Sequence, residues 1–155
     1  RLSIVIGRTA GGVTTAVMQG LIILVPGIVM GLKISGLAGF LLSLVFMVLI
    51  ATTFNSLGLA FASRMKDMSG FSLIMNFMVF PLFLLSGALF PISNLPTWLR
   101  SLSYLDPLTY GVDGLRGSLV GVNAFPLALD LAILAACCAG ALGLGAYLFE
   151  ISDVE

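Results

Sequence analysis

Four long apolar runs limit what this chain can fold into more than any other feature of its sequence. A helix needs about 20 apolar residues to cross the hydrocarbon core of a membrane. Four stretches reach that length, and only the last contains a charged residue, Asp130; they are residues 13–32, 40–62, 71–90 and 127–149. Because lipid satisfies no backbone N–H or C=O group, each stretch is predicted to form a membrane-spanning helix.

The composition excludes several classes of protein. Of the 155 residues, 59% are hydrophobic and 9% are charged, whereas a soluble domain is about a quarter charged. Seven basic and seven acidic residues give a net charge of zero, which argues against nucleic acid as a partner. With no histidine and two adjacent cysteines, the sequence contains neither a zinc-ligand set nor a Cys-His catalytic pair. We expect an all-α, polytopic integral membrane protein with one domain over residues 1–155, no catalytic residue, and no metal or cofactor of its own.

The basic residues of the loops predict the orientation of the chain. Four spans place both termini on one side of the membrane. That side carries four of the seven basic residues, in residues 1–12, 63–70 and 150–155, although its loops are the shorter ones. Positive charge concentrates in cytoplasmic loops, so the termini are predicted to be cytoplasmic and residues 91–126 extracytoplasmic. Because the chain begins at Arg1 and has no signal-peptide-like start, we expect that an N-terminal portion precedes it.

Four residues inside the apolar runs are unusual for a lipid-exposed helix. Pro26 and Pro81 each remove a backbone hydrogen-bond donor, so both are predicted to kink their spans. Asn55 and Asn76 carry polar groups that lipid cannot satisfy. We expect these two amides to face protein or a water-filled path.

Residues 91–126 are longer than an ordinary connection and more apolar than a disordered one. Their periodicity predicts two short amphipathic helices, of which the first begins near Pro96 and carries Trp98 as an interfacial anchor. Asp106 followed by Pro107 is typical of a helix N-cap with proline at the first helical position. The apolar face of the second helix is predicted to contain Leu108, Val112, Leu115 and Leu119. Two hypotheses stay open: a hairpin that dips into the membrane as an outer gate, and two helices that lie flat on its surface.

The sequence predicts different environments for the charged residues near the last span. Asp113 and Arg116 lie three residues apart and are predicted to share the polar face of the second short helix. Asp130 lies about one turn into the last apolar run. Its carboxylate is expected either to be solvated near the interface or to pair with a cation such as Arg116 or Arg100.

Five motifs carry a resemblance to a known family. They are FLLSGALFPI at residues 83–92, LP at 95–96, WL at 98–99, DPLTYGVD at 106–113 and LR at 115–116. Together they resemble the signature region of ABC-2 type transporter permeases, most closely the branch with drug-resistance and Nod-factor export permeases. The first residues, RLSIVIGR, also look like the cytoplasmic segment before the third span of these permeases.

The resemblance implies a permease half with six spans, cytoplasmic termini and two re-entrant helices between spans five and six. The four runs of this chain are then spans three to six. Residues 1–12, with Arg1 and Arg8, are then expected to contact an ATPase subunit, although both arginines also fit simple anchoring on the cytoplasmic side. The residues implied for the outer hairpin and gate are Pro91, Pro96, Trp98, Asp106, Pro107, Tyr110, Asp113 and Arg116.

The chain contains no ATP-binding motif of its own. A P-loop needs a lysine directly after a glycine, but the only two lysines, Lys33 and Lys66, follow Leu32 and Met65. We therefore expect ATP and Mg on a cassette ATPase, which is either a separate subunit or a separate region of a longer chain. We also expect a second permease half beside this one, and membrane lipid around both. The predicted function is the permease subunit of an ATP-binding cassette exporter in a bacterial or archaeal cytoplasmic membrane. Its expected substrate is lipophilic or amphipathic, such as a drug, a lipid or a glycoconjugate. An ion-coupled secondary transporter and a non-transporting membrane scaffold are the alternatives.

Overall fold

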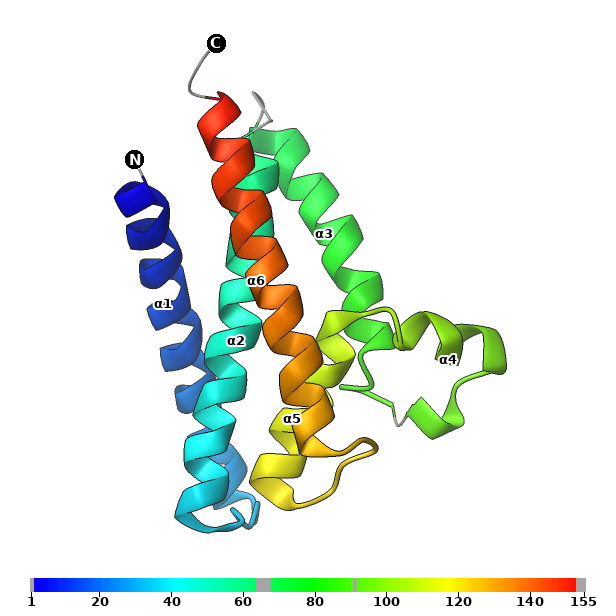
Figure 1. Cartoon of the computed structure of the whole chain (residues 1–155). Coiled ribbons are helices and arrows are strands. Elements are labelled where there is room, and N and C mark those ends of the chain that lie inside the picture. The colour runs from blue at the N-terminus through cyan, green and yellow to red at the C-terminus, as the bar shows by residue number, and fades with distance from the viewer. Residues whose placement is uncertain (1, 64–67, 91, 153–155) are drawn as a thin grey trace.

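The computed structural model describes residues 2–63, 68–90 and 92–152, and every regular element within these residues is helical. Figure 1 shows a small bundle of long helices with one helical excursion to its side. In chain order the elements are α1 (Leu2–Val29), α2 (Gly36–Ala62), α3 (Met68–Leu85), the short 3-10 helix η1 (Ile92–Asn94), α4 (Thr97–Ser103), α5 (Pro107–Val120) and α6 (Leu127–Ser152).

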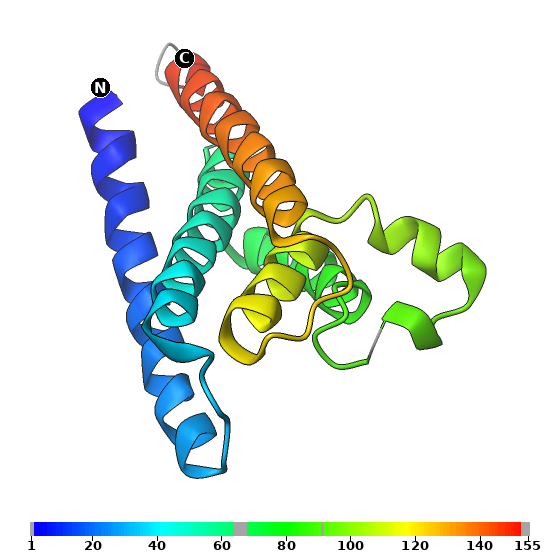
Figure 2. The same cartoon turned by 60° about the horizontal axis from the view of Figure 1, so that its bottom comes forward.

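Helix α2 forms the centre of the bundle. It packs against α5 and α6 on one side and against α1 on the other, as the two views in Figures 1 and 2 show. The side chains of Phe46 on α2 and Leu134 on α6 are fully buried. Helix α3 inclines away from α2, and α4 projects beyond it (Figure 1). The packed core therefore lies between α2, α5 and α6.

Three of the described helices are long and apolar enough to cross a membrane. They are Gly7–Val29 within α1, Gly36–Ala62, which is all of α2, and Leu127–Leu148 within α6. The two ends of the described chain lie at the same end of the bundle (Figures 1 and 2). The three long apolar helices fit a polytopic membrane protein.

The third predicted span differs from the structure. Helix α3 ends at Leu85, five residues before the end of the run 71–90. The chain turns there because Gly87 adopts a φ of 77°, in the left-handed region that glycine tolerates. Within α3 the described apolar part, Ser72–Leu85, is shorter than the three long helices. Within the described residues, three helices reach crossing length, whereas the sequence predicts four spans.

The first predicted span also differs, at both of its ends. Helix α1 begins at Leu2 and continues without a break to Val29. The predicted cytoplasmic segment 1–12 and the predicted span 13–32 therefore form one helix over most of their length.

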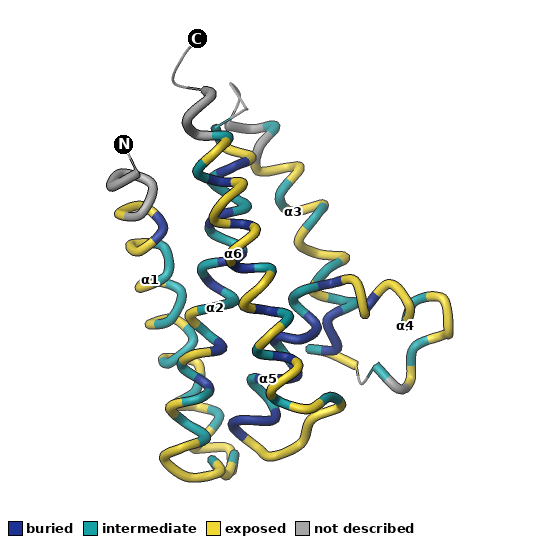
Figure 3. The backbone as a smooth tube through the Cα atoms, in the orientation of Figure 1, coloured by how far each residue is buried: buried dark blue, intermediate teal, exposed yellow. Residues whose placement is uncertain are grey.

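Burial is uneven along the bundle. Figure 3 shows buried positions gathered where α5 meets its neighbours, while α1 and α3 are mostly exposed or half-buried. The exposed side chains of α1 include large apolar ones, such as Ile23 and Val29. Such faces suit contact with lipid or with further transmembrane helices, because neither contact exposes apolar surface to water.

Candidate functional site

Helix α5 packs against both α2 and α6. Near its C-terminal end, Ser118 approaches Gly39 at the start of α2, and near its N-terminal end Gly111 meets Ile50 of α2 and Leu134 of α6. Ile50 lies 14 residues after Gly36, which is about 21 Å along α2 at 1.5 Å per residue. Helix α5 therefore runs antiparallel to α2, and its N-terminal end reaches the middle of that helix.

Glycines make this close packing feasible. A Cβ atom on Gly111 would lie 2.6 Å from Cγ1 of Ile50, and one on Gly114 would overlap the ring of Phe46. A Cβ atom on Gly117 would lie 2.8 Å from Cβ of Asn123, in the loop before α6. Small residues let helix backbones approach closely, which replaces the hydrophobic driving force that is absent between helices in lipid.

The apolar stripe predicted for α5 is not the face that is most buried in the bundle. Of its four predicted apolar residues only Leu119 is buried. The buried set is instead mostly small or polar: Thr109, Tyr110, Gly111, Asp113, Gly114, Gly117, Ser118 and Leu119. The glycines at positions 111, 114 and 117 were the sequence signal for this face, because a three-residue spacing keeps them on one side of a helix.

Asp113 holds the loop between α5 and α6. Its side chain is 4% exposed, and its two carboxylate oxygens accept hydrogen bonds from the backbone N–H of Ala124 at 2.9 and 2.8 Å. The N–H of Phe125 donates to the same carboxylate at 2.8 Å. Asp113 was predicted to share the polar face of this helix with Arg116, but its carboxylate is buried and binds the backbone of the loop before α6. Its partners lie 11 and 12 residues further along the chain.

The end of α3 is fastened to both helices of the hairpin. Arg116 of α5 donates from Nη2 to the carbonyl oxygen of Gly87 at 2.8 Å. The hydroxyl of Ser103 at the end of α4 donates to the carbonyl oxygen of Leu85 at 2.8 Å. Leu85 is the last residue of α3 and Gly87 lies two residues beyond it, so neither carbonyl is bonded within the helix, and the two donors complete their hydrogen bonding. Sequence reasoning singled out Arg116 but missed Ser103.

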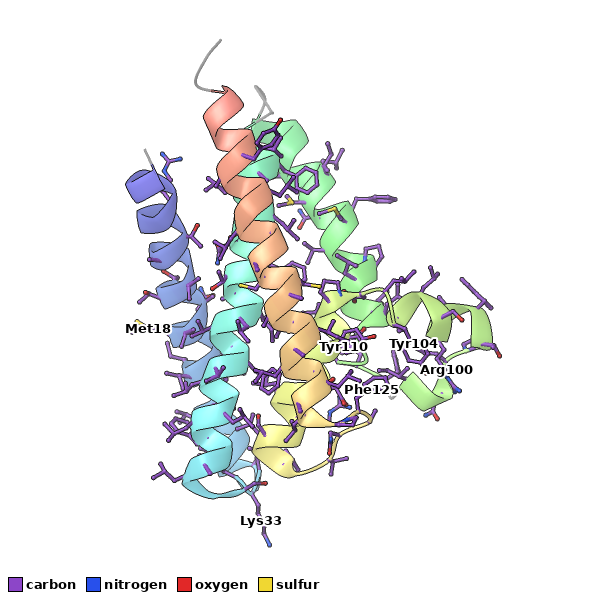
Figure 4. The ribbon with its side chains drawn as sticks, in the orientation of Figure 1. Met18, Lys33, Arg100, Tyr104, Tyr110 and Phe125 are labelled. Atoms are coloured by element: carbon purple, nitrogen blue, oxygen red, sulfur yellow. The ribbon has the colours of Figure 1, made fainter. Side chains whose placement is uncertain are left out.

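Three aromatic side chains join α4, α5 and the loop before α6. The hydroxyl of Tyr110 donates to the backbone carbonyl of Tyr104 at 2.8 Å. The ring of Phe125 packs edge-on against Tyr104 with centroids 5.8 Å apart, and lies 5.6 Å from the ring of Tyr110. Figure 4 shows these three residues converging beside the N-terminal end of α5. Trp98, on α4, is 66% exposed and takes no part in this cluster.

Asp106 caps α5 as the sequence predicts. Its Oδ1 accepts the N–H of Leu108 at 2.9 Å, and Pro107 occupies the first turn of the helix. The second oxygen of the carboxyl group is buried without a hydrogen-bond partner in the described chain. Burial raises the pKa of Asp106 from 3.8 to about 6, against the opposing effect of the Leu108 hydrogen bond. Pro96 is the N-cap residue of α4, and Pro91 lies outside the described residues.

Asp130 fits neither of its predicted environments. Its side chain is 0% exposed in the first turn of α6, so it is not solvated. Neither carboxylate oxygen has a hydrogen-bond partner in the described part of the chain, so pairing with Arg116 or Arg100 is not seen. No group of three or more metal-ligating side chains gathers anywhere within the described residues.

The remaining predicted residues lie along the long helices. Pro26 and Pro81 lie inside α1 and α3, three and four residues before the ends of these helices. The kinks expected at both prolines stay a prediction. Asn55 donates from Nδ2 to the carbonyl of Ala51 at 2.9 Å, whereas Asn76 is exposed on α3.

One end of the bundle contains a groove of about 380 Å³ between α1, α2 and α3. Arg8, one of the two arginines predicted to contact an ATPase, is exposed and lines this groove together with Thr9 and Asn55. Arg1, the other one, lies outside the described residues. Arg8 and Asn55 therefore line the same groove, a relation that the sequence did not predict.

Comparison with known proteins identifies the family. The sequence pattern described as ABC-2 type transporter matches residues 1–120. The Inner membrane transport permease YadH of Escherichia coli (strain K12) is 29% identical over 131 residues, which cover 84% of this chain and 50% of that protein. Nodulation protein J of Rhizobium leguminosarum bv. viciae is 27% identical over 134 residues, with the same coverage of 84% and 50%.

The chain spans about half the length of the curated relatives that it matches. Its long apolar helices and its likeness to an inner membrane permease identify a multi-pass protein of the cytoplasmic membrane. The family pattern covers more than half of the chain. On this ground, and in agreement with the helical bundle described above, the chain belongs to the ABC-2 type transporter family.

Proposed function

We propose that this chain is the membrane-spanning part of a permease subunit in an ATP-binding cassette exporter. The observation that carries the proposal is the position of α5, which is wedged between α2 and α6 with its N-terminal end opposite the middle of α2. Non-crossing helices at membrane depth are tolerated where protein or a water-filled path covers them. A re-entrant hairpin of this kind suits a gate on a transport path.

The hairpin, formed by α4 and α5, is proposed to close the outer end of that path. Its connections to its surroundings are specific: Arg116 and Ser103 bind the end of α3, and Asp113 binds the loop before α6. Such contacts give the hairpin one defined resting position. Opening then requires breaking a few hydrogen bonds together, which produces two discrete states and not a continuous movement.

The motor is proposed to be a separate cassette ATPase that contacts the N-terminal end of α1. Helix α1 is continuous from Leu2 to Val29, so a push at its cytoplasmic end tilts the full length of the helix. ATP binding changes the equilibrium between two permease states only if the ATPase contacts them differently. ATP and Mg are assigned to this partner, because the sequence contains no P-loop.

Helix α3 is proposed to face the path or the second permease half. Asn76 is exposed in the middle of its apolar surface, where lipid alone would leave the amide unsatisfied. A groove of about 720 Å³ on the same helix is lined almost wholly by apolar side chains, among them Leu73, Phe77 and Pro81. This character favours a lipophilic or amphipathic substrate, such as a drug, a lipid or a glycoconjugate.

Reconstitution tests the permease assignment. The full-length chain is co-expressed with each cassette ATPase encoded beside it, and the purified complex is placed in lipid vesicles. We expect vanadate-sensitive ATP hydrolysis and ATP-dependent export of an amphipathic dye. Failure of every neighbouring ATPase to bind the full-length chain would contradict the proposal.

Crosslinking tests the gate. With Cys137 and Cys138 replaced by alanine, cysteines at Tyr104 and Phe125 are bridged by a short bifunctional maleimide, because their rings are in contact. The bridge should block export and leave ATP binding intact. The control bridges cysteines at the exposed residues Thr97 and Ser101, one turn apart within α4 alone, and should leave export unchanged. Export that persists after efficient Tyr104–Phe125 bridging would remove the gate from the proposal.

A further inference from the structure

The groove between α1, α2 and α3 combines a polar side with an apolar one. Arg8 and Thr9 of α1 and Asn55 of α2 supply the polar side. Phe54 and Leu59 of α2 and Met75 of α3 are among its apolar lining residues. This combination differs from the purely apolar groove on α3 and indicates an amphipathic ligand.

The polar side contains an unused hydrogen-bonding group. Thr9 is 7% exposed, and its hydroxyl oxygen is buried without a partner anywhere in the described chain. Threonines further along α1 bond to their own helix, as Thr14 does with Ala10 and Thr15 with Gly11. A buried hydroxyl with no partner is costly, so a ligand that accepts its hydrogen bond is favoured.

Arg8 and Asn55 add donors beside this hydroxyl. Arg8 is an exposed cation with five N–H donors, and no acidic side chain lines the groove within the described residues. Asn55 spends one of its two amide hydrogens on Ala51, which leaves the other available. One cation and two neutral donors with no acid form a site for an anion that has several acceptor oxygens, such as a phosphate.

The position of the groove decides which kind of anion fits. Arg8 is the second residue of the apolar stretch Gly7–Val29, and the α2 residues of the groove lie in the last turns of Gly36–Ala62. The ends of crossing helices lie at the level of the lipid headgroups. A phosphate at this level belongs to an amphiphile whose chains run along Phe54, Leu59 and Met75.

We infer that this groove binds the phosphate headgroup of an anionic phospholipid, in the leaflet on the side of the α1 N-terminus. Arg8 pairs with the phosphate, while Thr9 and Asn55 donate hydrogen bonds to its oxygens. This assignment gives Arg8 a lipid as its partner in place of the ATPase expected from the sequence. It does not depend on which substrate the permease exports.

Lipid retention in nanodiscs tests the site. The full-length chain is placed in nanodiscs of phosphatidylcholine with increasing phosphatidylglycerol, and the retained lipid is identified by native mass spectrometry. Arg8→Gln should weaken phosphatidylglycerol retention about tenfold, the loss of one charge-assisted hydrogen bond. The matched control Lys33→Gln removes the same charge from the opposite end of the bundle, where Lys33 projects away from the helices (Figure 4). The control should change retention less than about twofold, and equal losses in both variants would overturn the site.

Thr9→Val separates ligand binding from folding. Without phosphatidylglycerol the variant should melt no lower than the unchanged chain, because it loses an unpaired buried hydroxyl. The rise in melting temperature that phosphatidylglycerol produces should shrink, since binding to the folded state is the source of that rise. Thr15→Val, at an exposed threonine of the same helix, should keep the full rise. A full rise in Thr9→Val would contradict the proposal.

Two competition experiments test whether the phosphate in the groove belongs to a resident lipid, to free phosphate or to a transported substrate. Inorganic phosphate at the same concentration should not displace phosphatidylglycerol, because it lacks the chains that contact the apolar side; displacement would overturn the lipid. A transportable amphipathic phosphate that displaces it only during ATP hydrolysis would identify the groove as a cargo site and would also overturn the resident lipid. Failure of export with phosphatidylglycerol retention intact would contradict the proposed function and leave this site standing.

Discussion

The contact of Gly114 with Phe46 gives a quantitative test of how α5 is held. A Cβ atom at Gly114 would collide with Cε1, Cζ and Cδ1 of the Phe46 ring, which is fully buried in α2. Overpacking a filled core costs about 1–3 kcal/mol, and three overlapping ring carbons place Gly114→Ala near the upper limit. Alanine gains about 1 kcal/mol over glycine in helix propensity. The net destabilisation is about 2 kcal/mol, which raises the fraction of open α5 about 30-fold.

Two further variants isolate the steric cause. Gly140→Ala on α6 has open space within 4 Å, so the same chemical change should be neutral or slightly stabilising. Gly114→Ala combined with Phe46→Leu should recover much of the loss, because the smaller side chain makes room for the new methyl group. A coupling of about 1 kcal/mol or more between the two sites is expected from the double-mutant cycle.

Hydrogen exchange of the α5 amides in nanodiscs measures the effect. In Gly114→Ala these amides should exchange about 30-fold faster, while those in the middle of α6 stay protected. Equal exchange in Gly114→Ala and Gly140→Ala would refute the packing argument. If the effects of Gly114→Ala and Phe46→Leu on stability simply add in the double mutant, the Phe46 ring is not the group with which the new methyl group collides.

Three other predictions concern the anchors of the hairpin. Arg116→Gln should loosen the end of α3 by about 1.5–3 kcal/mol, since the charged hydrogen bond to Gly87 is lost. Labelling of a cysteine at the half-buried neighbour Ala88 should then become faster. Because the pKa of Asp106 is raised in the folded protein, its neutral form stabilises the fold. This stabilisation is complete below about pH 4 and is lost as the pH rises through 6. Asp106→Asn keeps the cap and should abolish the resulting fall in melting temperature between pH 5 and pH 7.5. Asp130→Leu removes a buried carboxyl group that has no hydrogen-bond partner in the described chain, so it should increase the free energy of unfolding by about 1–3 kcal/mol and raise the melting temperature. A melting temperature below that of the unchanged chain would show that the carboxyl group has a stabilising partner.

Local signals explain what could be predicted. Asp106 and Pro107 begin α5 as expected, because an N-cap and a first-turn proline act within a few residues of the backbone they serve. Gly121 ends the same helix with a φ of 76°, also a local effect. In contrast, the partner of Arg116 lies 29 residues away along the chain, and no spacing rule connects Arg116 to Gly87.

The failed predictions share one physical cause. The apolar stripe predicted for α5 includes Leu108, Val112 and Leu115, which are half-buried, whereas Asp113 and the glycines are buried. That rule rests on water as the surrounding medium, and next to lipid apolar side chains gain little by turning inward. Asp130, in the first turn of α6, is also buried, and its burial depends on how closely neighbouring helices approach.

By itself the sequence determined that this chain is helical and crosses a membrane, because each backbone polar group in lipid must be satisfied within its own segment. It also determined the family, through the motifs of the hairpin, and where the helices of that hairpin begin. Only the tertiary structure decided the depth of α5, the joining of Arg116 and Ser103 to the end of α3, and the groove beside Arg8. These features depend on close contact between residues far apart in sequence, and such contacts are set by the shapes of packed helices.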